Sequence, residues 1–406
     1  MNKPRVALLH YAAPPVIGGV ETTLAAQARL FADHGYRVQV IAGRGAAFDA
    51  RIPVSILPDA DTRAPRVLEV NRQLARGTVS PEFHALARDL ETALVSALGD
   101  CDVLIAHNVL SLHKNLALTT ALRSIANTPR VKIIAWCHDL AWHDPVYADQ
   151  LHAGLPWDLL RQVWDGVRYV VVSTARQKEL ARLLRLEEKD VAVVPPGIDA
   201  LEFLGIGETA ARWARAFRWL DAAPLLLLPA RVTRRKNIEL AIEITAALRE
   251  LGRAPQLVVM GPLGPHNPAN AAYLQELRGL QRARHAEDAV LFLQEHGTVS
   301  DAERRDLYAL ADALLFPSAR EGFGIPILEA GLARLPIFCS DLPAFRELAG
   351  ANAHCFSLDE SPALIARRMA QFLDQDACYQ LKQRVLREYA WDRIFAQRIQ
   401  PLVEGG

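Results

Sequence analysis

The alternation of short apolar runs with longer amphipathic segments constrains the fold of this chain more than any other feature. Most of the apolar runs lack the period-two pattern of a half-exposed strand, so they are typical of strands buried on both faces of a parallel sheet. Helical patterns separate many of them, and repeated strand–helix–strand order predicts doubly wound sheets. Strands are expected at residues 6–9, 38–42, 54–57, 102–106, 131–136, 169–173 and 191–194, and again at 225–229, 256–260, 290–293, 313–316, 336–339 and 354–356.

The two strand series predict two α/β domains, residues 1–195 and 196–390. The first series ends and the second begins between Pro195 and Asp221, and Pro195-Pro196-Gly197 marks the start of that boundary. Each domain is expected to be a doubly wound, Rossmann-like sheet, and the two are expected to face each other across a cleft. Ligands of such sheets bind beyond the carboxyl ends of the strands. Helices are expected at 21–34, 82–98, 114–126, 174–186, 237–251, 269–284, 301–310, 326–332, 362–373, 377–389 and 391–403.

Charge and cysteine content exclude several classes of protein. Lys and Arg together number 46, as do Asp and Glu, so there is no basic excess for non-specific nucleic-acid binding. No apolar run approaches the ~18 residues of a membrane span, and the N-terminal apolar stretch is too short for a signal peptide. The five cysteines are scattered without a CxxC pair, which is typical of reduced thiols. A cytoplasmic protein is therefore expected.

A basic amphipathic segment, residues 208–220, lies at the predicted boundary. Trp213, Phe217 and Leu220 fall on one helical face, with three arginines around them. Two interpretations fit this pattern. The helix packs on its own domain, which we favour, or it lies on a membrane surface.

The segment most informative about chemistry is residues 318–331. It follows a predicted strand, and glycines lie on both sides of Phe323 before Pro326, which suits a first helical turn. Exposed N–H groups at that helix start would favour phosphate oxygens. The carboxylates of Glu321 and Glu329 are hydrogen-bond acceptors, which suits sugar hydroxyls. A loop with an acidic helix start and one surface glutamate fits the local pattern equally well.

A basic segment follows the first predicted strand of the second domain. Arg231 and Lys236 lie near the carboxyl edge of that strand, beside a helix start. A guanidinium fork together with an ammonium suits the two negative charges of a diphosphate. A solvated basic loop is the alternative, and we assign Arg234 and Arg235 to it.

Two further signals lie in the first domain. Gly18-Gly19 forms a turn into a helix after the first strand, but it lacks the GxGxxG dinucleotide fingerprint, so no nicotinamide or flavin site is predicted. His138-Asp139 ends a strand, where a histidine can face the cleft. A plain turn and a structural histidine with an aspartate cap are the alternatives.

Together these motifs resemble the retaining nucleotide-sugar glycosyltransferases of glycosyltransferase family 4, which have the glycosyltransferase B fold. The resemblance covers nearly the whole chain. The segment from Trp391 resembles the family's last helix, so residues 391–406 are expected to pack back on the first domain. The matching parts are Gly18-Gly19-Val20-Glu21, His138-Asp139, Val172-Ser173 with residues 195–199, Arg231 with Lys236, and the Glu-x7-Glu signature from Glu321 to Glu329.

The resemblance implies a role for each matched residue. Arg231 and Lys236 would hold the donor diphosphate. Glu321 and the backbone after it would bind sugar hydroxyls, whereas Glu329 would bind the nucleoside ribose. His138 would contact the donor sugar near the reacting carbon. The implied catalytic residues are His138, Glu321, Arg231 and Lys236, the implied donor-binding residues are Gly19, Arg231, Lys236, Val299, Glu321, Gly322, Phe323, Gly324, Ile325 and Glu329, and the implied acceptor-side residues are Gly18, Gly19, His138 and Asp139.

The resemblance also implies hexosyl transfer with retention, from a nucleoside-diphosphate sugar to an acceptor hydroxyl. A two-step route needs a carboxylate nucleophile about 5 Å from its partner, and none stands out besides Glu321. In the front-face route usual for the family, the leaving phosphate oxygen takes the acceptor's proton, and the protein contributes positioning and charge stabilisation. No cofactor and no metal are expected. A metal-dependent glycosyltransferase A fold would have to use Asp59 and Asp61.

The sequence leaves the donor and the acceptor open. GDP-mannose and UDP-glucose both fit, and residues 107–110 with 136–141 resemble enzymes that mannosylate small glucosylated acids such as glucosylglycerate. The alternatives are a lipid or cell-surface polysaccharide acceptor, a related phosphorylase or epimerase, and a catalytically silent sugar-nucleotide-binding protein. The intact set of Glu321, Arg231 and Lys236 argues against silence.

Overall fold

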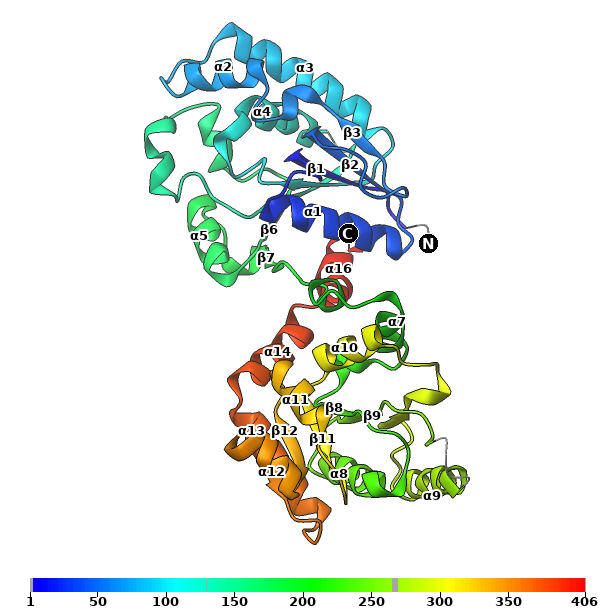
Figure 1. The fold of residues 1–406 in the computed structure, drawn as a ribbon. Coiled ribbons are helices and arrows are strands. Elements are labelled where there is room, and N and C mark those ends of the chain that lie inside the picture. Colours follow the sequence, from blue (N-terminus) through cyan, green and yellow to red (C-terminus); the bar gives the residue numbers. More distant parts are fainter. Residues whose placement is uncertain (1–2, 129, 265–268, 406) are drawn as a thin grey trace. The chain divides into compact units, whose positions relative to one another are not determined.

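The structure, a computed structural model, describes residues 3–128, 130–264 and 269–405 (Figure 1). It divides into two compact units. The first contains residues Met1–Ile198 and Tyr389–Gly406, and the second contains Asp199–Glu388. The last helices of the chain, red in Figure 1, are thus part of the first domain, and the segment after Ile198 belongs to the second.

The first domain is built on a seven-stranded sheet in the order β3-β2-β1-β4-β5-β6-β7, and every neighbouring pair is parallel. Its strands are β1 (Val6–Ala12), β2 (Val38–Arg44), β3 (Val54–Ile56), β4 (Val103–His107), β5 (Lys132–Cys137), β6 (Arg168–Val171) and β7 (Val191–Val193). Its helices are α1 (Gly19–Asp33), α2 (Pro65–Leu74), α3 (Pro81–Leu98), α4 (Leu116–Ala126), α5 (Thr174–Leu184), α15 (Trp391–Ile394) and α16 (Gln400–Glu404), with a π-helical turn at Phe395–Ile399.

Alternate residues of β1 enter the cores on the two faces of this sheet. Ala7 and Leu9 join the cluster that includes α2, α3 and α4, whereas Val6 and Leu8 join the cluster that includes α1 and the last helices. In the second cluster the rings of Phe31 and Phe395 meet edge to face, 5.1 Å apart. Such pairs add about 0.5–1.5 kcal/mol to the burial of the rings. They help to hold the C-terminal segment against α1.

The second domain repeats the design with six parallel strands in the order β10-β9-β8-β11-β12-β13. Its strands are β8 (Leu225–Leu228), β9 (Gln256–Val259), β10 (Val290–Phe292), β11 (Ala313–Phe316), β12 (Ile337–Ser340) and β13 (His354–Phe356). Its helices are α6 (Ala200–Phe203), α7 (Glu208–Ala216), α8 (Ile238–Glu250), α9 (Ala269–Ala283), α10 (Asp301–Leu310), α11 (Ile325–Leu332), α12 (Pro343–Ala349), α13 (Pro362–Gln375) and α14 (Ala377–Glu388).

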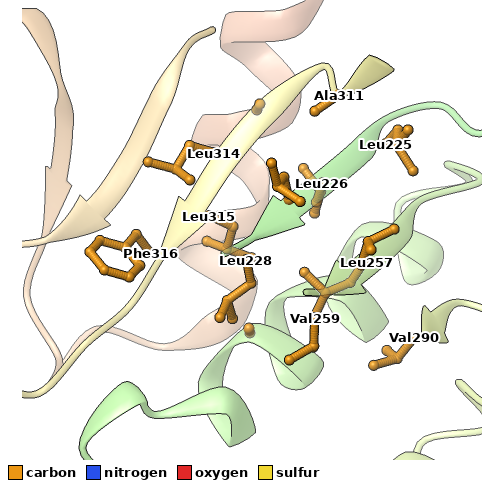
Figure 2. Packing of buried hydrophobic residues seen from close by; sticks show 14 of the residues in the cluster. Leu225, Leu226, Leu228, Leu257, Val259, Val290, Ala311, Leu314, Leu315 and Phe316 are labelled. Atoms are coloured by element: carbon orange, nitrogen blue, oxygen red, sulfur yellow. The ribbon is translucent and has the colours of Figure 1, made fainter. Parts of the chain in front are cut away.

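The apolar runs of the second domain form a single core. All four leucines of β8 and all four residues of β11 are buried, and they pack with Leu257 and Val259 of β9 (Figure 2). Because these strands carry helices on both faces, each is apolar throughout, as the sequence pattern indicated. The core fixes where the carboxyl ends of β8 and β11 lie.

In both sheets the strand order reverses at one point. The chain runs outward from β1 through β2 to β3 and then restarts on the other side of β1 with β4, and β8 and β11 stand in the same relation. Loops after such neighbouring strands diverge and leave a crevice for a ligand. Residues 13–18 and 108–115 follow β1 and β4, and residues 229–236 and 317–324 follow β8 and β11.

The linker segment settles one of the sequence-based alternatives. Trp213 in α7 is 5% exposed and belongs to the core of the second domain, against which Phe217 and Leu220 also pack. The apolar face that would enter a membrane surface is therefore occupied by the protein's own core. Among the described residues, no helix combines the length and apolarity needed to cross a bilayer.

Candidate active site

The basic turn after β8 borders a cavity of about 630 Å³, a size typical of small-molecule sites. Arg231 and Lys236 both line it, together with Pro326 at the start of α11. Arg231 is exposed. Thr233 also lines the cavity, and its buried hydroxyl has no hydrogen-bond partner among the described residues. The structure therefore places both predicted diphosphate ligands at one cavity.

Lys236 and Glu321 form an ion pair at the carboxyl edge of the second sheet. The Lys236 ammonium contacts Glu321 Oε1 and lies 4.8 Å from the centroid of the Phe316 ring, at the end of β11. Both side chains of the pair are about nine-tenths buried. Ser318 donates its hydroxyl to the same carboxylate oxygen at 3.1 Å. The pair was not expected from the sequence, which gave Lys236 to a diphosphate and Glu321 to a sugar.

The assignment of Arg235 to a solvated basic loop was wrong. Its Nη1 donates to Glu321 Oε2 at 2.9 Å, so it contacts the site and is not merely solvated. Arg234 also has a partner, because its guanidinium donates to both carboxylate oxygens of Glu276 and lies over the Tyr273 ring. The sequence missed these pairings because the acidic partners come from α9 and from the loop after β11.

Burial and charge act in opposite directions on the two members of the pair. Burial alone would raise the pKa of Glu321, but hydrogen bonds and charges from Lys236 and Arg235 outweigh it and leave the pKa below its usual value. Burial lowers the pKa of Lys236, while the hydrogen bond that its ammonium donates to Glu321 opposes that effect. The arrangement keeps Glu321 ionised near neutral pH.

Gly324 shapes the turn between Glu321 and α11. Its φ of +110° lies in the region that favours glycine, and a Cβ there would come within 2.7 Å of the Phe345 ring. Phe323 and Ile325 are half exposed, with 52% and 59% of their surface accessible, and Gly322 is also exposed. The backbone of this turn is therefore open to a ligand at the start of α11, where N–H groups point outward.

Glu329 lies in the fifth position of α11 and is held by α10. Tyr308 donates its hydroxyl to Oε2 at 2.7 Å, and Arg304 approaches Oε1 at 3.1 Å. The side chain is 23% exposed, so it remains partly accessible while its orientation is fixed. Val299, the predicted base contact, is partly buried just before α10 and packs on the domain core.

The first domain carries a cluster of buried histidines at the carboxyl edge of its own sheet. His138 Nε2 lies 3.0 Å from His107 Nδ1, and His10 Nδ1 donates to the His107 carbonyl at 2.9 Å. Asn108 Oδ1 accepts the His138 amide at 2.7 Å. His10 Nε2 lies 3.8 Å from Glu21 Oε1. His10 lies near the end of β1, His107 ends β4 and His138 follows β5. β1 and β4 are the strands on either side of the switch point.

Burial keeps this cluster neutral. It lowers the pKa of His138 to about 4, with a smaller contribution from His10. Burial also lowers the pKa of His107 and of His10. The His107 Nε2 atom is buried without a hydrogen-bond partner among the described residues. The sequence identified His138 but missed His10 and His107, whose positions at the ends of two neighbouring predicted strands were the available signal.

The remaining predicted residues of the first domain lie at the start of α1 and just after β5. Gly18 and Gly19 lie at the start of α1, and Gly19 is exposed with open space where a side chain would be. Asp139 is exposed and accepts from the Asn108 amide at 3.3 Å. The exposed amide end of this 15-residue helix is suited to an anion.

The carboxylates considered for a metal are engaged elsewhere. Asp59 and Asp61 flank the end of a short 3-10 turn, where Arg66 and Arg44 approach them at 3.2 Å and 2.6 Å. Within the described ranges, no group of three or more His, Cys, Asp or Glu side chains is arranged to hold a metal ion.

Family models match both halves of the chain. Residues 17–200 match the model described as Glycosyltransferase Family 4, and residues 211–392 match the model described as Glycosyl transferases group 1. Together with the two Rossmann-like sheets, these matches show that the chain belongs to the family 4-type glycosyltransferases with the glycosyltransferase B fold.

Several relatives are similar to parts of the chain. The serotype-specific mannosyltransferase WbdA of Escherichia coli is 41% identical over 75 residues, which are 18% of this chain and 9% of that protein. The mannosylglucosylglycerate synthase of Thermotoga maritima is 24% identical over 373 residues, 84% of this chain and 82% of that enzyme. The D-inositol 3-phosphate glycosyltransferase of Kineococcus radiotolerans is 32% identical over 192 residues, 46% and 42% of the two chains.

Proposed function

We propose that this glycosyltransferase moves a hexosyl group, with retention and without a divalent metal, from a nucleoside-diphosphate sugar to an acceptor hydroxyl. The observation that carries the proposal is that Lys236, which is paired with the buried Glu321, lines one cavity together with Arg231. Two cations suit the diphosphate, and a carboxylate that stays ionised suits the hydroxyls of the attached sugar.

The chemistry follows from where charge develops. As the bond between the anomeric carbon and the leaving oxygen breaks, negative charge grows on the diphosphate, and Lys236 and Arg231 are placed to stabilise it. The acceptor oxygen bonds to the same face of the anomeric carbon, and its proton passes to the leaving phosphate oxygen. The neutral His138 can contact the sugar without adding a charge to the first domain. Glu329 is proposed to bind the ribose of the donor.

The acceptor is proposed to be a small glucosylated acid such as glucosylglycerate. The relative that aligns with 84% of the chain is named a mannosylglucosylglycerate synthase. WbdA is also named a mannosyltransferase, so we favour mannose over glucose as the transferred sugar and GDP-mannose over UDP-glucose as the donor. The alternative of a lipid acceptor loses its main support, because Trp213 is buried in the second domain. A cell-surface polysaccharide acceptor stays an alternative.

One experiment tests donor, acceptor and stereochemistry together. Purified protein is incubated with GDP-mannose or UDP-glucose and with glucosylglycerate, and the product's anomeric configuration is determined by NMR. An α-linked product from an α-linked donor is expected, and Lys236→Ala should abolish most of it. In parallel, a nucleoside diphosphate at 100 times its dissociation constant should stabilise the wild type by about 2.7 kcal/mol. Binding without transfer to any acceptor offered would support a sugar-nucleotide-binding protein instead.

A further inference from the structure

Arg235 joins the two loops that flank the switch point of the second sheet. Its Nη1 donates to Glu321 Oε2 at 2.9 Å and, less directly, to the carbonyl of Arg320 at 3.3 Å. Its own carbonyl accepts a hydrogen bond from the Ala319 amide at 2.8 Å. These contacts reach three consecutive residues of the loop after β11. Arg235 therefore fixes that loop against the basic turn after β8.

The proposed function, on which this inference rests, gives Lys236 two partners that compete. In the structure its ammonium contacts Glu321 Oε1, whereas transfer requires it at the donor diphosphate. The Glu321 side chain is 9% exposed, so a carboxylate that lost its counterion there would be strongly disfavoured and would tend to take up a proton. A protonated Glu321 would be a poorer acceptor for sugar hydroxyls. Some other cation must then stay with Glu321.

We propose that Arg235 is the positioning residue of Glu321: by holding Oε2 it keeps the carboxylate ionised and oriented when Lys236 turns to the diphosphate. The two cations bind different oxygens of one carboxylate, so Lys236 can leave without Arg235 moving. Arg235 is half exposed, and its guanidinium remains charged at any physiological pH. Oε1 is then open to the donor sugar.

The first test compares Arg235→Ala, Arg235→Lys and Arg249→Ala by steady-state kinetics against pH. Arg249 is a matched control, because it pairs with Asp288 at 2.7 Å near the other end of α8, away from the cavity. The charged groups facing Glu321 are Lys236 and Arg235, and Ser318 adds a hydroxyl. Removing Arg235 should lower kcat about tenfold, the lower end of the effect expected of a charged hydrogen bond.

The acid limb of the pH dependence of kcat distinguishes a positioning role of Arg235 from a general loss of structure. Because Arg235 holds the pKa of Glu321 down, Arg235→Ala should shift the acid limb of kcat to higher pH. Arg235→Lys should restore the limb and part of kcat, and Arg249→Ala should match the wild type. An Arg235→Ala enzyme with wild-type kcat and an unmoved acid limb would overturn the proposal.

A double-mutant cycle tests whether Arg235 acts through Glu321. In a Glu321→Gln background there is no carboxylate charge to hold, so adding Arg235→Ala should change kcat by less than about twofold. If the same tenfold loss appeared in that background, Arg235 would act directly on the donor and the positioning role would be wrong.

A binding experiment separates this inference from the proposed function. Carboxyl carbon NMR follows Glu321 in the wild type and in Arg235→Ala, each saturated with inorganic pyrophosphate. We expect Glu321 to stay ionised at pH 6 in the wild type and to gain a proton in the variant. Failure of pyrophosphate to bind the wild type would refute the proposed function. Normal binding with the same Glu321 titration in both proteins would refute the inference alone.

Discussion

The two sheets of this protein have the same design but opposite electrostatics at their switch points. The first sheet gathers His10, His107 and His138, which burial keeps neutral. The second gathers Lys236 and Arg235 around Glu321, and the two cations hold the pKa of that carboxyl below its usual value against the effect of burial. The comparison teaches that a shared fold fixes where side chains meet but not their charge. We therefore expect the two carboxyl edges to respond differently to mutation and to pH.

The largest expected effect is on turnover, and it comes from the charged edge of the second sheet, which holds Lys236, Arg235 and Glu321. Lys236→Ala removes a cation aimed at developing negative charge, and loss of one such group lowers turnover by about a hundredfold or more. The donor Michaelis constant should rise less, because the interaction is made chiefly in the transition state. Steady-state kinetics beside Arg249→Ala checks this. A variant with full turnover and only weakened binding would place Lys236 in uniform donor binding.

The neutral edge of the first sheet, which holds His10, His107 and His138, should make the stability of that domain depend on pH in the acid range. The folded pKa of His138 is about 4, below the unfolded value near 6.5, so the unfolded chain binds more protons between these values and stability falls as pH falls. Between pH 7 and pH 5, the lowered pKa of His138 alone should reduce the free energy of unfolding by about 2 kcal/mol. Hydrogen exchange of the full chain should show β1, β4 and β5 loosening before β8 and β11. His138→Gln should flatten this dependence, and equal loosening of both sheets would contradict the comparison.

A smaller effect should separate the two glutamates within the charged edge. Glu329, held by Tyr308 and Arg304, is proposed to bind the nucleoside, so Glu329→Ala should weaken nucleoside diphosphate binding about tenfold. Glu321→Gln should lower turnover while leaving that affinity nearly intact. Calorimetric titration with GDP and UDP, set beside kinetics, measures both. Identical patterns for the two variants would remove the proposed division of roles.

The smallest expected effect is that of a chelator. If Lys236 and Arg231 supply the charge that a divalent ion supplies elsewhere, activity should survive EDTA unchanged. The assay compares initial rates before and after EDTA and after added Mg²⁺ or Mn²⁺. Loss of activity restored by either ion would return attention to Asp59 and Asp61.

The sequence was most informative where burial imposes a long apolar pattern. Every predicted strand has a counterpart in the structure. The pattern is clearest in β8 and β11, which are buried throughout and apolar at every position. Three helices were missed, and α6, with four residues, is the shortest of them. α12 has only seven residues, and α2 shows its core face only through Val67, Val70 and Leu74 among charged side chains. Short helices depend on packing more than on their own pattern.

The sequence by itself determined which residues stand at the ends of the strands. Polar residues that follow buried strands gather at the carboxyl edge of a parallel sheet. That rule identified Arg231, Lys236 and Glu321 in the second sheet and His138 in the first. Only the tertiary structure decided how they pair: Arg235 with Glu321, Tyr308 with Glu329, and His138 with His107. These partners lie 86, 21 and 31 positions apart in the chain. No local pattern encodes such a contact, because strand order and loop geometry bring the two side chains together.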